Sequence, residues 1–86
     1  MLSNKITVTT TAAALGTEQI NGPLLVYALA DNTNAVVLGD LNVVAASGFP
    51  LEKGESVTFG NVSNLEHIYA VVGTGTEELG WIKLAP

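Results

Sequence analysis

The residues that could carry chemistry in this sequence are few and scattered. His67 is the only histidine, and its neighbour is Glu66. If both lay in a strand, their side chains would point to opposite faces, so Glu66 could not orient His67 as a base. The sequence also lacks the GxSxG pattern of a nucleophile elbow. We therefore interpret His67 as a surface residue and expect that the protein is not an enzyme and has no catalytic residues.

Carboxylates form two close pairs, Glu52 with Glu55 and Glu77 with Glu78. Glycosidases place two carboxylates across a cleft, but a chain of this length has little room for a deep cleft. Neighbouring carboxylates in turns are usually solvated. We therefore interpret both pairs as parts of solvated turns.

A metal or phosphate site has weak support. Hard cations take carboxylate and amide oxygens, so Asp31, Asn32 and Asp40 could form a loose divalent-cation site, but their spacing matches no calcium loop. The sequence contains no cysteine, which excludes a disulfide and a Cys/His metal site. Residues 73–76, Gly-Thr-Gly-Thr, lack the third glycine and the following helix of a dinucleotide loop, so we expect a hairpin turn there. We expect no cofactor and no bound metal.

The aromatic residues could form a ligand platform or fill a core. Sugar-binding modules stack sugars on exposed rings, so Trp81 with Tyr27 or Tyr69 could form such a platform. Large aromatic side chains in small β domains more often fill a core or an interface. We favour the second role and keep a carbohydrate-binding module as the alternative function.

The elements that would position these residues are short strands. Residues 5–12 alternate between polar and apolar, which predicts a half-buried strand. Residues 24–30 are apolar on both faces, as in a strand covered by a second layer or by another subunit. The Asp-Asn-Thr-Asn turn at 31–34 should close a hairpin. Further strands are predicted at 35–38, 43–45, 56–59, 68–72 and 79–84, with breaks at 21–23 and 60–61 and a helical turn capped by Ser63 or Asn64.

This spacing predicts an all-β fold. About six to seven short strands, separated by Gly, Asn and Pro, are typical of a small antiparallel β-barrel or β-sandwich. No linker or internal repeat divides the chain. We expect a single β domain over residues 1–86.

Length and composition point to self-association. A domain of 86 residues buries only about 60% of the surface of its unfolded chain, and 48% of these residues are apolar while 13% are charged. Part of the apolar surface should therefore meet another subunit. The candidate interface residues are Leu25, Tyr27, Leu29 and Trp81, and the alternative face of the same strand is Leu24, Val26 and Ala28. We expect a homo-oligomer, with a closed trimer as the first choice.

Several partner classes are disfavoured. A net charge of −5 removes the counterion release that drives binding to nucleic acid. The longest apolar run, residues 24–30, is far shorter than the ~20 residues of a membrane helix. The first residues show no secretory signal. We expect a soluble protein with no nucleic-acid or membrane partner.

The stretch SGFPLEKGESVTF, residues 47–59, carries the most specific pattern. Its turn reads G-x-P-L-x-x-G-E-S and contains Gly48, Pro50, Leu51, Gly54 and Glu55, and an L-x-x-I-Y-A segment follows at 65–70. We expect Gly54 to adopt a positive φ there and the residues around it to form a solvated turn. Val57 and Phe59 should then face the core. With the order of strands and turns from residue 23 to 84, the sequence resembles small β-barrel virion proteins of tailed bacteriophages.

The resemblance implies a structural virion protein, either a capsid decoration (cement) protein or a head-fibre base. The short chain, without a fibre stalk, favours a decoration protein that binds the outside of the assembled head. It would be made in the bacterial host cytoplasm, with the major capsid protein as partner and the virion surface as its location. The alternative is a carbohydrate- or receptor-binding module of a head fibre or tail.

Overall fold

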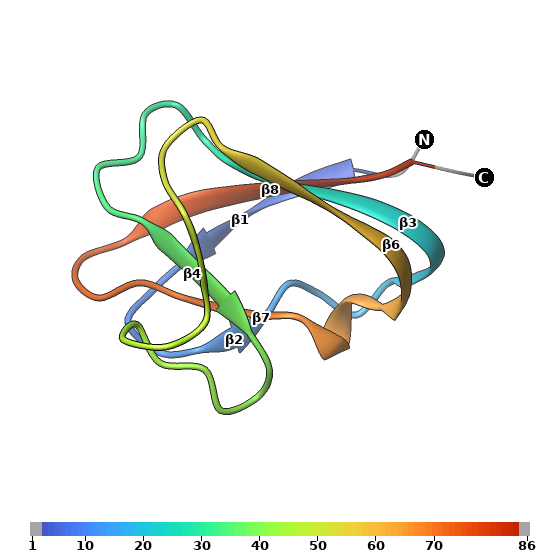
Figure 1. Ribbon diagram of the computed structural model, residues 1–86, viewed down its shortest axis with the longest axis horizontal. Coiled ribbons are helices and arrows are strands. Elements are labelled where there is room, and N and C mark those ends of the chain that lie inside the picture. The colour runs from blue at the N-terminus through green and yellow to red at the C-terminus, as the bar shows by residue number, and fades with distance from the viewer. Residues whose placement is uncertain (1–2, 85–86) are drawn as a thin grey trace.

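The computed structural model describes residues 3–84, and these residues form two antiparallel sheets of four strands each (Figure 1). The first sheet has the order β1-β8-β3-β6 and the second sheet the order β2-β7-β4-β5. The all-β prediction is confirmed. The sheets do not close into a barrel, so the arrangement is compatible with the predicted sandwich, and it has eight strands instead of six or seven. The elements are β1 (Ser3–Val8), β2 (Ala13–Ala14), β3 (Gln19–Ala28), β4 (Val36–Gly39), β5 (Phe49–Leu51), β6 (Ser56–Asn64), the 3-10 helix η1 (Leu65–His67), β7 (Tyr69–Val71) and β8 (Glu77–Lys83).

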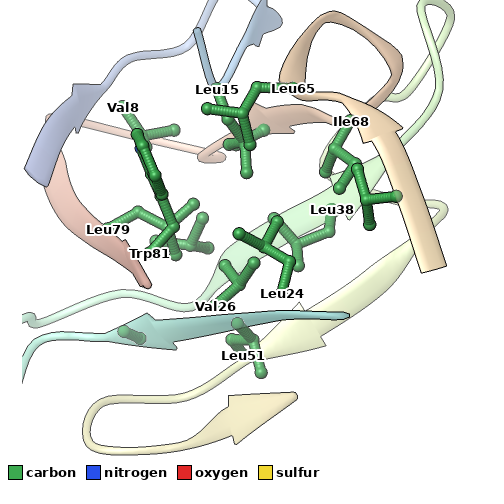
Figure 2. Packing of buried hydrophobic residues seen from close by; sticks show 14 of the residues in the cluster. Val8, Leu15, Leu24, Val26, Leu38, Leu51, Leu65, Ile68, Leu79 and Trp81 are labelled. Atoms are coloured by element: carbon green, nitrogen blue, oxygen red, sulfur yellow. The ribbon is translucent and has the colours of Figure 1, made fainter. Parts of the chain in front are cut away.

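The two sheets share one apolar core (Figure 2). Alternate residues of each strand point inward, because side chains alternate between the faces of a sheet. Fully burying an aliphatic side chain contributes about 1.5–3 kcal/mol, so this layer supplies most of the folding free energy. The inward residues include Leu24, Val26 and Ala28 of β3, Leu79 and Trp81 of β8, Val36 and Leu38 of β4, and Leu51 of β5.

The path of the chain differs from the predicted hairpins. Within residues 3–84, β4 and β5 are the only consecutive strands that lie in the same sheet, and every other connection crosses from one sheet to the other. The turns predicted to close hairpins at 31–34 and 73–76 are therefore crossovers, which corrects both predictions. Turn residues reverse the chain, but they do not determine which sheet receives the next strand.

Two predicted breaks lie inside strands. Residues 21–23 belong to β3, where Asn21 has a φ of 52° and the pairing with β6 shifts register on both sides of Gly22. The same shifts let β6 continue through residues 60–61. A bulge absorbs an extra residue without ending a strand, which explains both differences. The strand predicted at 43–45 is instead part of a loop, with one isolated bridge between Val44 and Ser47.

Candidate functional site

The most exposed large apolar side chains gather around the β4–β5 loop, residues 40–48. Leu41 is 67% exposed, Val44 is 54% exposed, and Phe49, directly after the loop, is 53% exposed. Among the large exposed apolar residues of the described chain, only Leu84 lies elsewhere. Single exposed apolar residues are ordinary on a protein surface, whereas several in one place mark an interaction site. We call Leu41, Val44 and Phe49 the apolar cluster.

The β4–β5 loop is held in place by local contacts. Val43 is buried and packs against Val37 and Val71 on the outer side of the second sheet. Asp40 forms the preceding turn, because its carbonyl oxygen accepts from the Val43 N–H at 3.0 Å and its Oδ1 accepts from the Asn42 N–H at 2.9 Å. These contacts fix the loop while Leu41 and Val44 remain exposed.

Gly48 closes the loop at a position that admits no side chain. Its φ is +128°, a conformation that L-residues rarely adopt. A Cβ atom there would lie 2.6 Å from the Leu38 carbonyl oxygen, 2.7 Å from Val37 Cγ1 and 2.8 Å from Val43 Cγ2. Glycine is therefore required for the loop to pack onto β4.

A pocket of about 260 Å³ opens beside this loop, between the two sheets. Leu38, Phe49, Phe59 and Ile68 form its apolar walls. Phe49 lies in β5 and Phe59 in β6, and these strands are edge strands of different sheets. The sheets are not joined at this side, which leaves the pocket open. Leu38 and Ile68 are buried residues of the core cluster, labelled in Figure 2, and they form the inner part of the pocket.

Two polar side chains line the pocket, and one of them is acidic. Asp40 and His67 also line it, and both side chains are exposed. Glu66, next to His67, is exposed as well. None of the three lysines of the chain lines the pocket. The pocket therefore combines apolar walls with the exposed carboxylate of Asp40, and Phe49 belongs both to its wall and to the apolar cluster.

His67 lies on the surface, as predicted, but at the end of η1 instead of in a strand. The helical turn was predicted, and its N-cap is Asn64, whose side chain accepts from the Glu66 N–H at 2.8 Å. Asn64 thereby satisfies a backbone donor at the start of the turn. The turn places His67 beside the pocket, which strand alternation in the sequence could not indicate.

Trp81 is not on the surface, where an interface residue must lie. Its side chain is 1% exposed and belongs to the core, which corrects its assignment to an interface. The reason is that side chains alternate between the two faces of a strand. Trp81 pairs with Val26, an inward residue of β3, so both point into the core. The Trp81 indole Nε1–H has no hydrogen-bond acceptor among the described residues.

The other three predicted interface residues are half-buried, and Leu25 and Tyr27 lie on the outer side of the first sheet, while Leu29 follows the end of β3 in the loop that leads to β4. Tyr27 is paired with Gly80, and a Cβ atom at Gly80 would overlap the Tyr27 ring. The ring therefore covers the glycine of the neighbouring strand. Part of this outer face is thus covered by its own side chains.

The sugar platform that was kept as the alternative does not form from its named residues. Trp81 lies in the core, and Tyr27 lies on the outer side of the first sheet. Tyr69 packs against Val37, Val43 and Val71 on the outer side of the second sheet. A stacking platform needs rings on one exposed surface. These three rings lie in three different layers.

The pair Glu77 and Glu78 is not a solvated turn, which corrects that prediction. Glu77 begins β8 and is 8% exposed, and its carboxylate oxygens accept from the backbone N–H groups of Thr33 at 3.1 Å and Asn34 at 2.7 Å. The buried Asn32 amide donates to the Glu78 carbonyl oxygen at 2.8 Å and accepts from the Glu78 N–H at 3.1 Å. Glu77 and Asn32 therefore fasten the β3–β4 loop to β8. Only the pair Glu52 and Glu55 is exposed, as predicted.

The residues of the possible cation site are separated. Asp31 and Asn32 line a hollow of about 330 Å³ with Glu77 and Glu78, whereas Asp40 lines the apolar pocket. Within residues 3–84, no group of three or more His, Cys, Asp or Glu side chains is arranged to hold a metal ion. The same part of the chain contains no helix long and apolar enough to span a membrane.

The turn motif of residues 48–55 forms β5 and the turn into β6. Leu51 is buried in the core, and Pro50 lies in the edge strand β5, where a missing N–H is tolerated. Gly54 has a φ of +78°, as predicted, and Glu55 accepts from the Glu52 N–H at 2.9 Å. The prediction that Val57 and Phe59 face the core is also confirmed. Comparison with family models, characterised proteins and solved structures finds no match for the chain.

Proposed function

We propose that the protein is a structural assembly component that docks onto a larger protein shell, as capsid decoration proteins do on the heads of tailed bacteriophages. The observation that carries this proposal is the apolar cluster, with Leu41 and Val44 on the ordered β4–β5 loop and Phe49 at the start of β5, beside an open pocket. Binding energy at protein interfaces concentrates in a few apolar anchors and the pockets that they fill. The cluster provides exposed apolar side chains, the pocket provides a hollow for a side chain of the partner, and Phe49 belongs to both.

The fixed loop favours docking on a repetitive shell. A loop that is already ordered loses less conformational entropy on binding than a flexible loop. Burial of Val43 and the turn at Asp40 supply that order. A protein that binds assembled shell and not separate subunits shifts the equilibrium toward the shell. The proposed partner is the major capsid protein, and the proposed location is the outside of the virion.

Self-association is part of the proposal and uses the opposite side of the molecule. Leu25 and Tyr27 lie on the outer side of the first sheet, whereas the β4–β5 loop packs on the outer side of the second sheet. A closed trimer formed through the first sheet would leave the apolar cluster free. Such a trimer matches the threefold positions of a shell, where three capsid subunits meet.

Co-sedimentation with purified expanded capsids of a tailed phage tests the docking. We expect the wild-type chain to pellet with the capsids and the double variant Leu41→Ser, Val44→Ser to remain in the supernatant. Leu84→Ser is the matched control, because Leu84 is 42% exposed and lies outside the apolar cluster. If the wild type binds no capsid state, or if the double variant pellets like the control, the docking proposal is wrong.

Light scattering tests the oligomer separately. We expect the mass of three chains at micromolar concentration. The double variant should keep that mass, because its substitutions lie away from the first sheet. The mass of a single chain would exclude the trimer and leave the docking proposal to be judged by co-sedimentation alone.

A further inference from the structure

We infer that the pocket between β5 and β6 receives one large apolar side chain of the docking partner, and that an arginine or lysine of the partner lies next to that side chain. This inference rests on the proposed function and specifies the chemistry of the partner. It follows from the size of the pocket, from its walls and from the charges around it.

The size of the pocket fits one side chain. Sites for drug-sized ligands occupy about 300–1,000 Å³, and this pocket has about 260 Å³. Its walls are two phenylalanine rings and two aliphatic side chains, and Phe49 is 53% exposed. Apolar anchors that fill such pockets dominate protein–protein binding energy. An aromatic or leucine side chain is therefore the best-fitting occupant.

The pocket is accessible from the side of the molecule. Phe49 and Phe59 come from edge strands of different sheets, so no strand lies across the opening. Gly48 and Pro50, on either side of Phe49, restrict the backbone there, since Gly48 packs tightly on β4 and Pro50 has a fixed φ. The backbone that carries Phe49 is therefore held in position before a partner arrives.

The charges around the pocket determine which kind of partner residue lies next to the apolar side chain in the pocket. Asp40 lines the pocket, Glu66 is exposed next to His67, and the three lysines lie outside the lining. The chain as a whole carries a net charge of −5. Opposite charges across an interface steer association and exclude wrong partners. A cation close to the faces of Phe49 and Phe59 also gains cation–π attraction.

Nuclear magnetic resonance titration with three small probes tests this chemistry on the full chain. The probes are phenethylammonium, which has a ring and a positive charge, phenylacetate, which has a ring and a negative charge, and methylammonium, which has no ring. We expect phenethylammonium to cause saturable shifts of the backbone amides of Leu38, Phe49, Phe59 and Ile68. Phenylacetate should bind about 2- to 5-fold more weakly, as expected for one exposed charge contact. Methylammonium should cause no saturable shift there.

Two variants separate the contributions of ring and charge. Phe49→Ala should abolish the saturable shifts of the remaining wall residues. Asp40→Asn should remove the preference for phenethylammonium over phenylacetate while both still bind. Asp31→Asn is the matched control, because Asp31 is exposed and lines a different hollow, and it should leave the preference unchanged.

The inference is overturned if phenethylammonium causes no saturable shift at the wall residues up to its solubility limit. It is also overturned if phenylacetate binds at least as tightly. Capsid co-sedimentation distinguishes a failure of the proposed function from a failure of this inference. If Phe49→Ala pellets with capsids as well as the wild type, docking stands and the pocket inference is wrong. If the titrations succeed but no capsid binds, the pocket chemistry stands and the proposed partner is wrong.

Discussion

β4 is preceded by the loop of residues 29–35 and followed by the loop of residues 40–48, and the two loops are fixed by different kinds of contact. In the first loop, the buried Glu77 carboxylate accepts two backbone N–H groups, and the Asn32 amide forms two hydrogen bonds with the backbone of Glu78. In the second loop, one buried side chain, Val43, and a few turn hydrogen bonds hold the backbone.

The difference separates a loop that serves stability from one that is available for binding. Buried polar groups must find partners inside the protein, so Glu77 and Asn32 direct their hydrogen bonds to the fold itself. The loop held by Val43 needs no such network, and its remaining apolar side chains, Leu41 and Val44, stay exposed. Substitution of Glu77 or Asn32, which fasten the first loop, should therefore change stability, and substitution of the exposed apolar side chains of the second loop should change docking.

The largest effect is expected for Glu77→Ala. It leaves the N–H groups of Thr33 and Asn34 without their acceptor, and hydrogen bonds to a charged group contribute about 1.5–3 kcal/mol each. We expect the free energy of unfolding in urea, followed by circular dichroism, to fall by about 3 kcal/mol. Glu78→Ala is the control, because the Glu78 side chain is exposed, and it should stay within about 0.5 kcal/mol of wild type. Equal effects of the two substitutions would show that the Glu77 carboxylate does not hold the loop.

A smaller loss is expected for Gly48→Ala. The new Cβ atom would meet the Leu38 carbonyl oxygen and two valine side chains, at a φ of +128°. Such backbone strain costs about 1–3 kcal/mol, and we expect a loss of about 2 kcal/mol. Gly54→Ala is the matched control. Its φ is also positive, but a Cβ atom there meets open space, so its loss should be about 1 kcal/mol. If Gly48→Ala costs no more than Gly54→Ala, the close packing of the loop on β4 is wrong.

The smallest effect on stability is expected for the double variant Leu41→Ser, Val44→Ser. Both side chains are more than half exposed, so the free energy of unfolding should stay within about 0.5 kcal/mol of wild type. The same urea titration checks this value. Together with lost capsid binding, an unchanged stability would assign the second loop to docking. A loss as large as that of Gly48→Ala would instead make these side chains part of the fold.

Local features of the fold were predictable from the sequence. Alternation in residues 5–12 and 56–59 identified β1, which ends at Val8, and the first part of β6, the Gly54 turn was recognised by its residue types, and Asn64 was identified as a possible helix cap. The pairing of strands was not predictable, because it joins distant segments such as Ser3 with Ile82. Turn chemistry reverses a chain equally well within a sheet and between sheets.

The site was predictable only in part. Leu79 and Trp81 are two residues apart in an alternating strand, so their shared inward face could have been read from the sequence. The burial of Glu77 could not have been read from the sequence, because it depends on contact between the β3–β4 loop and β8. Phe49 and Phe59 were recognised as aromatic residues. Their pocket arises only because β5 and β6 are edge strands of different sheets.

Trp81, the single tryptophan of the chain, lies 1% exposed among aliphatic side chains with no hydrogen-bond acceptor for its indole N–H. An indole in such apolar surroundings fluoresces at shorter wavelengths than an indole in water. Unfolding should therefore shift the emission of the chain to longer wavelengths. The protein carries its own optical reporter of the folded fraction, outside the apolar cluster, and that reporter is the same in the wild type and in every variant described above.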